Sequence, residues 1–300
     1  MSLFIKAAEV WQPDPSGQHL VLSSFHYGDL EAFANASQNM AFGFGEGMPG
    51  RTWAERRPLI WTDLNAEQFK RAHQAEEADL ACALSIPVFA GDFLLGVMVL
   101  FCGKGDDLSG AVEIWHNPNS STNELKLADG YYGRLERFEW ISRRLTILHG
   151  RGLPGRAWDQ NRPVMIHDLP NSNSFLRARN AEECGITTGF AVPFSNSSQE
   201  VQIVTFLSTL TTPIAKRFEI WNPDMGDRYL LFKTGFCAES SILDERYRDV
   251  AYARGQGAIG ETWLSGRPLV EESDSASQER TAYIPLIIDG KLQSLVCLVF

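Results

Sequence analysis

The sequence has no apolar run long enough to cross a membrane and no excess of basic residues. A spanning helix needs about 20 consecutive apolar residues, whereas the longest apolar run, from Phe93 to Cys102, lies between Asp92 and Lys104. The net charge of −10 at pH 7 argues against nucleic acid, because neutralising phosphates requires a basic face. We therefore expect neither a membrane nor nucleic acid among the partners.

Cysteine is also scarce, and no targeting signal is visible. The five cysteines are odd in number and far apart in the sequence, which indicates a reduced compartment rather than a disulfide framework. The opening MSLFIKAAEVW has neither the sustained apolar core nor the cleavage site of a signal peptide. These features predict a cytoplasmic protein.

What the sequence has instead is a threefold repeat. GEGMPGRTWAERRPLIWTDL begins at Gly45, GRGLPGRAWDQNRPVMIHDL at Gly150 and GQGAIGETWLSGRPLVEESD at Gly255, an offset of 105 residues each time. This period exceeds the roughly 20–50 residues of a solenoid unit and suits a small domain. We therefore expect three domains, at residues 1–105, 106–212 and 213–300.

The first copy predicts the elements of one domain. KAAEVW and HLVLSSFHY alternate around the turn PDPSG, which indicates a β-hairpin. A helix, the short strand MAFGF, the glycine loop, a short helix, the strand PLIWTDL, the amphipathic segment EQFKRAHQAEEADL and two apolar strands follow. This order predicts an α+β domain, with a mostly antiparallel sheet of about six strands flanked by helices.

The middle copy also carries a recognisable motif series. Gly-x-Gly-Leu-Pro-Gly-Arg-x-Trp from Gly150, then Arg-Pro-Val, a strand ending Asp-Leu, and Phe-x-Arg-Ala together resemble GAF domains of bacterial signalling proteins. The first copy is nearly as similar and the third is less so. The resemblance implies three tandem GAF-like domains forming a non-enzymatic small-molecule sensor or regulatory module. It identifies neither ligand nor cofactor, because this scaffold binds diverse molecules.

The three glycines of each copy also match the Gly-x-Gly-x-x-Gly fingerprint of dinucleotide-binding proteins. That fold needs a crossover of about a dozen residues or more, but only residues 51–57 separate Gly50 from Pro58. We therefore expect the glycines to provide positive φ and close backbone approach in a tight turn. The following Trp53, Trp158 and Trp263 are expected to close the core behind it.

The third copy has lost a segment that the other two keep. Pro58 and Pro87 are 29 positions apart, whereas Pro268 and Pro285 are 17 apart. In GAF domains the missing segment commonly forms a lid over the ligand pocket. The resemblance therefore implies a ligand beneath lid helices of domains one and two, and a ligand-free third domain.

Four positions in each lidded copy are candidate ligand-binding residues. The aromatic Phe69 and Phe175 could stack on a planar ligand or anchor the lid to the sheet. Arg71 and Arg177 could clamp an anion or be solvated charges. Asp63 and Asp168 could bind a ligand or cap a helix. The full set is Trp61, Asp63, Phe69, Arg71, His167, Asp168, Phe175 and Arg177.

No catalytic or metal-binding constellation is recognisable. His167 has no second metal ligand nearby in the sequence. GAF-like methionine sulfoxide reductases carry a cysteine in the glycine loop, where this chain has Met48, Leu153 and Ala258. A competing hypothesis is a ligand-free scaffold or oligomerisation protein whose pockets are filled by its own side chains. A separate effector protein and a homo-oligomer are further candidate partners.

Overall fold

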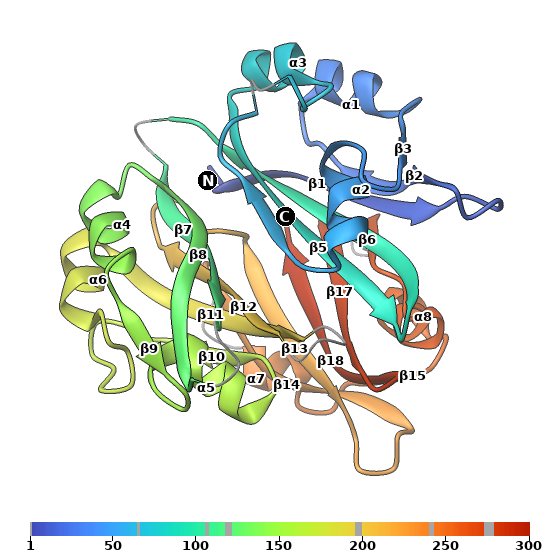
Figure 1. Ribbon diagram of the computed structural model, residues 1–300. Helices are drawn as coiled ribbons and strands as arrows, with labels where there is room; N and C mark the ends of the chain where they lie inside the picture. The colour runs from blue at the N-terminus through green and yellow to red at the C-terminus, as the bar shows by residue number, and fades with distance from the viewer. Residues whose placement is uncertain are drawn as a thin grey trace.

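The computed structural model describes residues 2–64, 67–105, 108–117, 122–195, 200–239, 243–272 and 279–300. Three six-stranded sheets follow one another along the chain, each with its own short helices (Figure 1). The expected boundaries at residues 105/106 and 212/213 fall between successive sheets.

The first domain has the element order expected from the sequence. It contains β1 (Ile5–Pro13), β2 (His19–His26), α1 (Glu31–Ser37), β3 (Ala41–Gly43), α2 (Gly47–Glu55), β4 (Leu59–Trp61), α3 (Ala72–Glu77), β5 (Leu80–Ala90) and β6 (Phe93–Gly103).

Domain two repeats this series, and domain three repeats it without a described helix between its fourth and fifth strands. Domain two contains β7 (Ser109–His116), β8 (Glu124–Gly133), α4 (Glu136–Ser142), β9 (Thr146–Leu148), α5 (Gly152–Gln160), β10 (Val164–Ile166), α6 (Ala178–Cys184), β11 (Ile186–Ser195) and β12 (Val201–Thr209). Domain three contains β13 (Arg217–Pro223), β14 (Tyr229–Cys237), α7 (Leu243–Tyr247), β15 (Ala251–Ala253), α8 (Gly257–Ser265), β16 (Leu269–Glu272), β17 (Arg280–Ile288) and β18 (Lys291–Val299).

All three sheets have the same topology. Their strand orders are β3-β2-β1-β6-β5-β4, β9-β8-β7-β12-β11-β10 and β15-β14-β13-β18-β17-β16. The strand pairs of the described residues are antiparallel, for example β4 with β5 and β5 with β6. The predicted α+β class with mostly antiparallel sheets is confirmed, and the parallel crossover of a dinucleotide-binding fold does not occur after the glycine loops.

The glycines of the repeated motif serve the turn that leads into α2, α5 and α8. The first of them has positive φ in each copy, +80° at Gly45 for example, and its amide donates to the carbonyl of the third. A Cβ on Gly50 would lie 2.0 Å from the carbonyl oxygen of Gly43. A side chain is therefore excluded there, as expected from the sequence.

The tryptophans behind this turn are less buried than the sequence suggests. Trp263 is buried, but Trp53 and Trp158 are only half-buried, and Trp158 stands edge-on to His149 with ring centroids 4.6 Å apart. The tryptophans that fill the domain cores are Trp11, Trp115 and Trp221, on the first strand of each sheet. Trp53 and Trp158 therefore pack against the edge of their domain cores instead of lying inside them.

The segment between the fourth and fifth strands forms a lid in domains one and two. We define the lids as residues 67–79 and 172–185. Their helices are shorter than expected, because α3 begins at Ala72 and α6 at Ala178, after turns that contain Phe69 and Phe175. Between β16 and β17 of domain three, the described residues contain no helix.

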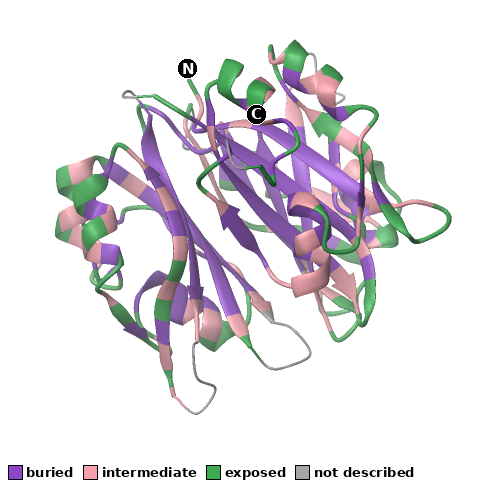
Figure 2. Cartoon of the chain, turned by 45° about the horizontal axis from the view of Figure 1, so that its top comes forward, coloured by how far each residue is buried: buried purple, intermediate pink, exposed green. Residues whose placement is uncertain are grey.

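The inner faces of the three sheets pack against one another and form one shared core. Figure 2 shows buried strands toward the middle of the molecule and partly exposed helices at its periphery. Strand residues alternate between this shared core and the domain's own core beneath the helices. On β1, for instance, Val10 belongs to the shared core and Trp11 to the core of domain one.

The domains contact one another in a closed ring. Domain three meets domain one where Ser24 Oγ accepts the amide of Val270 at 2.9 Å. Domain two meets domain three where His167 Nε2 lies 3.2 Å from Thr234 Oγ1. Domain one meets domain two through β4 and β8. In each pair the fourth strand of one domain, or the residue after it, faces the second strand of the next, so one chain closes a head-to-tail ring.

Candidate functional site

A glutamate is buried on the first strand of each sheet, on the side that faces the helices. These residues are Glu9, Glu113 and Glu219, and each lies two positions before a buried tryptophan. The indole of that tryptophan donates to the carboxylate, with Nε1–Oε2 distances of 2.8, 2.8 and 2.9 Å. Because a buried carboxylate is costly unless it is paired and hydrogen-bonded, each site must supply further donors.

In domain one, the remaining donors come from the lid, α1 and the end of β2. The guanidinium of Arg71 binds both oxygens of Glu9, with an Nη2–Oε2 distance of 3.1 Å. Tyr27 donates its hydroxyl to Oε1 at 2.8 Å, and Ser37 completes the group. Burial and the charge of Glu9 raise the pKa of Tyr27, so the phenol stays protonated and continues to donate.

Domain two repeats this arrangement with its own residues. Arg177 from the lid binds both oxygens of Glu113, with an Nη2–Oε2 distance of 2.9 Å. Tyr132 donates to Oε1 at 3.0 Å, and Arg177 also donates to Ser142. Arg177 is only 2% exposed and its guanidinium lies over the ring of Phe138. In both lidded domains, therefore, the lid is fixed to the sheet through a buried ion pair.

Domain three supplies the same donors from other elements. Arg217, on β13 itself, binds Glu219 Oε1 through Nε at 2.6 Å. Tyr247, on α7, donates to the same oxygen at 2.6 Å. Cys237, at the end of β14, pairs with Arg217 in the sheet. At the equivalent position, at the end of the second strand, the other two domains have the tyrosine that donates to the glutamate. The carboxylate is thus neutralised without a lid.

The structure brings the predicted aromatic and arginine residues together beneath the lids. Phe69 and Phe175 are buried in the domain cores, which supports their interpretation as anchors of the lid. Arg71 and Arg177 do clamp an anion, but that anion is the carboxylate of the same domain. They are not solvated charges. Their binding of an external ligand stays a prediction.

The other four predicted residues lie away from the Arg–Glu pairs. Asp168 is exposed and accepts hydrogen bonds from the backbone and side chain of Asn171 in the turn after β10. It does not cap the next helix, because α6 begins at Ala178. Asp63 is exposed just after β4. Trp61 lines a cavity of about 670 Å³ between domains one and two, and His167 lines one of about 560 Å³ near β14 of domain three.

The glutamates, tyrosines and Arg217 were not predicted as site residues. The repeated Glu-x-Trp was visible in the sequence, and a charged residue inside an apolar strand signals a buried partner. Arg217 carried a second signal, because it stands two positions before Glu219 where the other copies have Ala7 and Ala111. Only the copy without a lid arginine has an arginine in the strand.

Among the described residues, no group of three or more histidine, cysteine or acidic side chains is placed to hold a metal ion. No helix in the same part of the chain is both long and apolar enough to span a bilayer.

A family model described as GAF domain matches residues 5–115. The chain carries a GAF domain. Domains two and three repeat its sheet order and its buried Glu–Trp pair, so the chain consists of three tandem GAF-like domains. A comparison with curated proteins found no match.

Several solved structures are similar to one domain of this chain. A free methionine-R-sulfoxide reductase from Neisseria meningitidis, in complex with its substrate, has 17% identity and a TM-score of 0.25 over 35% of this chain and 53% of its own. A GAF domain from an Acinetobacter phosphoenolpyruvate-protein phosphotransferase has 16% identity and a TM-score of 0.26, over 35% and 59%.

A GAF domain/HD domain protein from Geobacter sulfurreducens has 13% identity and a TM-score of 0.28, over 33% of this chain and 64% of its own. This chain thus spans about half to two thirds of the length of these three structures.

Proposed function

We propose that the protein is a non-enzymatic regulatory module of the GAF type, in which the lids of domains one and two respond to a small molecule. One observation carries this proposal. In both lidded domains the lid itself supplies the arginine that neutralises the buried glutamate, whereas Arg217 on β13 does so in domain three. Among the described residues, the buried carboxylates of domains one and two are therefore the ones whose arginine partner moves with a lid, whereas Arg217 stays on β13 and also pairs with Glu279 at 3.2 Å.

The ion pair defines what a ligand beneath the lid must offer. Entry of a ligand there would separate Arg71 from Glu9, and breaking a buried pair without replacement costs about 3–5 kcal/mol. A ligand with an anionic group for the arginine, or a cationic group for the glutamate, would offset that cost. Binding would then shift the lid between two states, which a separate effector protein could recognise.

Hydrogen exchange in the full chain tests whether the lids move in this way. Replacing Arg71 and Arg177 together by lysine keeps the charge but removes the bidentate contact, so we expect faster amide exchange in residues 67–79 and 172–185. The matched control is Arg217→Lys, which we expect to leave exchange in both lids unchanged. Equal lid exchange in the double variant and the unmodified protein would refute the proposal.

A second candidate function is a ligand-free scaffold, and the filled interior favours it. Phe69, Phe175 and the Arg–Glu pairs occupy the space beneath the lids. Mass spectra of the purified protein under native and denaturing conditions distinguish the two candidates. A bound molecule in the native spectrum supports the sensor, and its absence together with unresponsive lids supports the scaffold.

The chemistry of the thiols fits a regulatory protein in a reducing compartment, which we propose is the cytoplasm. All five cysteines are free. Cys82 and Cys297 are fully buried, and burial raises the pKa of both thiols. Buried thiols with raised pKa values are poor nucleophiles, which supports a non-enzymatic role.

A further inference from the structure

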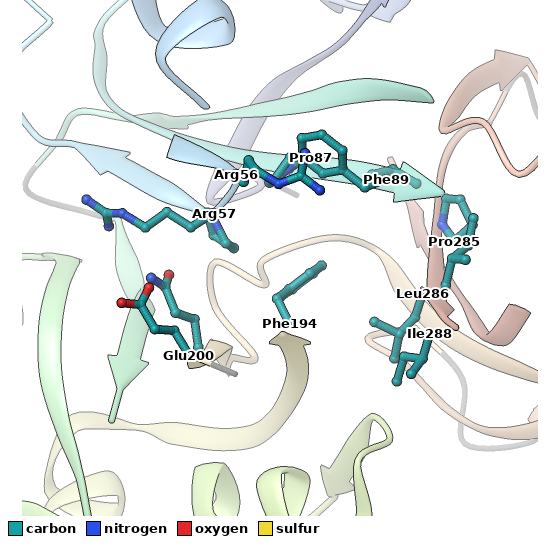
Figure 3. A pocket seen from close by; sticks show the side chains of 13 residues that line it. Arg56, Arg57, Pro87, Phe89, Phe194, Glu200, Pro285, Leu286 and Ile288 are labelled. Carbon is teal, nitrogen blue, oxygen red and sulfur yellow. The ribbon is translucent and has the colours of Figure 1, made fainter. Parts of the chain in front are cut away.

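A second candidate binding site lies between domains one and two, away from the buried Arg–Glu pairs. It is a cleft of about 670 Å³, within the size range of small-molecule pockets. Arg51, Arg57 and Trp61 of domain one line one side, and His116, Asp129 and Gln202 of domain two line the other. In the adjoining smaller cavity, Figure 3 shows Arg57 and Glu200 extending toward the same space from the two domains.

The contact between domains three and one shows why this cleft is open. There, Pro268 lies against Gly96, and a Cβ on Gly96 would be 2.9 Å from Pro268 Cγ. The residue of domain two equivalent to Gly96 is Gln202. Gly96 precedes Val97, which pairs with Trp11. Gln202 likewise precedes Ile203, which pairs with Trp115. A side chain at this position excludes the close proline contact, so domains one and two remain separated there.

A second position on the cleft wall also departs from the other two contacts. Ser24, Asp129 and Thr234 are equivalent, because each lies opposite the residue before the buried tryptophan. Ser24 and Thr234 make the contacts to the neighbouring domain described above. Asp129 instead lines the cleft, where a carboxylate takes the place of a hydroxyl group.

Gln202 lines the same space, and its side-chain oxygen is buried and unpaired just behind the cleft wall. Its side chain is only 6% exposed, and its Oε1 accepts no hydrogen bond from the described residues. Leaving a buried acceptor unpaired costs free energy. Turning the Gln202 amide toward the cleft would let a ligand donate a hydrogen bond to this oxygen and recover that cost.

The charges around the cleft restrict the kind of ligand. A purely anionic molecule would meet the carboxylates of Glu55, Asp129 and Glu200, and a purely cationic one would meet the guanidinium groups of Arg51 and Arg57. A molecule with both charges matches both sets. We propose that this cleft binds a small zwitterion of the amino-acid class, free or as a dipeptide. Its carboxylate contacts the guanidinium of Arg57, which also pairs with Glu55 at 2.5 Å. Its ammonium contacts Asp129 and the turned amide oxygen of Gln202, and its side chain packs on Trp61.

The electrostatics of the walls support this assignment. Burial raises the pKa of Asp129 and lowers the pKa of His116, and the charge of Arg57 acts on both groups from the other domain. Partly desolvated ionisable groups that face one cleft from two domains are typical of a binding site. The site does not rest on the lid proposal, because it uses neither Arg–Glu pair.

Thermal shift and calorimetry with the full chain test the cleft. The probes are the twenty amino acids and their glycyl dipeptides, followed, for the best binder, by the amine without its carboxylate and the acid without its ammonium. We expect at least one zwitterion to raise the melting temperature, and both single-charge analogues to fail. Asp129→Ser and Arg57→Ala should each weaken binding by about tenfold or more.

Matched controls come from the neighbouring domain contact. Arg162→Ala changes the equivalent arginine outside the cleft and Thr234→Ser the equivalent β14 position, and neither should alter the affinity. The proposal is overturned if no probe binds, if the acid or amine analogue binds as tightly as the zwitterion, or if Arg162→Ala weakens binding as much as Arg57→Ala. Binding lost in Arg71→Lys but kept in Asp129→Ser would place the ligand beneath a lid instead.

Discussion

At the scale of single residues, each buried glutamate needs hydrogen-bond donors and a positive charge close to its carboxylate. Glu9 and Glu113 take an arginine from a lid and a tyrosine from the second strand. Glu219 takes both donors from other elements. The carboxylate persists in all three domains while its partners change position, because an unpaired buried charge would cost more than moving the donors.

Removing one lid arginine should measure that requirement. Arg177→Ala leaves Glu113 buried with one partner fewer, and we expect the free energy of unfolding to fall by about 3–5 kcal/mol. The control is Arg179→Ala, two positions later on α6, since the Arg179 side chain is 88% exposed and its ion pair with Glu183 lies on the surface. Its loss should cost less than about 1 kcal/mol. Urea unfolding of both variants checks this, and similar losses in the two would contradict it.

The sequence predicted the elements better than their contacts. The β-β-α-β-α-β-α-β-β order was correct because alternation and turn residues are local properties. The lid helix was predicted too long because Phe69 and Arg71 fit its amphipathic pattern, but the structure has them in the preceding turn, directed to the sheet. The partner of Arg71 lies 62 residues away, and no local pattern reveals a contact at that separation.

The ring contacts were equally invisible in the sequence. The expected sites at Trp61 and His167 assumed that each domain acts alone, whereas both residues line spaces between domains. At the repeat offset they align with Glu271 and Glu272, but the repeat does not indicate which domains contact one another. What the repeat could predict was that three similar sheets exist, not that their inner faces pack together.

One strand contact should make stability depend on pH. His26 on β2 stacks on the C-terminal Phe300 at 5.4 Å. Burial, with the charges of Arg280 and Lys216, lowers the pKa of His26 from 6.5 to about 4. The unfolded chain therefore binds a proton between pH 6.5 and 4 that the folded chain does not, so stability falls as the pH decreases through this window.

Replacing this histidine should flatten the profile. We expect His26→Gln to show a smaller loss of the free energy of unfolding between pH 6.5 and 4 than the unmodified protein. His19→Gln, an exposed position on the same strand, should leave the profile unchanged. Denaturant titrations at several pH values measure both. An unaltered profile in His26→Gln would show that this side chain is solvated in the folded protein.

At the scale of the whole molecule, the shared core joins domains that the sequence presents as separate. Phe190 of domain two stacks on Phe206 at 4.5 Å and packs against Phe218 of domain three at 4.6 Å. Phe4 and Ile5 of domain one donate backbone hydrogen bonds to Pro213 and Ile214 before β13. An isolated domain would expose its inner face to water, so we expect the three domains to unfold as one unit.

Phe190→Ala tests that cooperativity, because its ring contacts side chains of two domains. Truncating a buried phenylalanine costs about 3–5 kcal/mol. If the shared core couples the domains, the decrease in the free energy of unfolding should be equal when measured at the slowest-exchanging amides of β1, β7 and β13. Fluorescence and circular dichroism should also report one unfolding transition. Phe175→Ala serves as the comparison, because Phe175 lies in the core of domain two alone. Two separate transitions in the unmodified protein, or faster exchange confined to domain two in Phe190→Ala, would show that the ring is an assembly of independently stable domains.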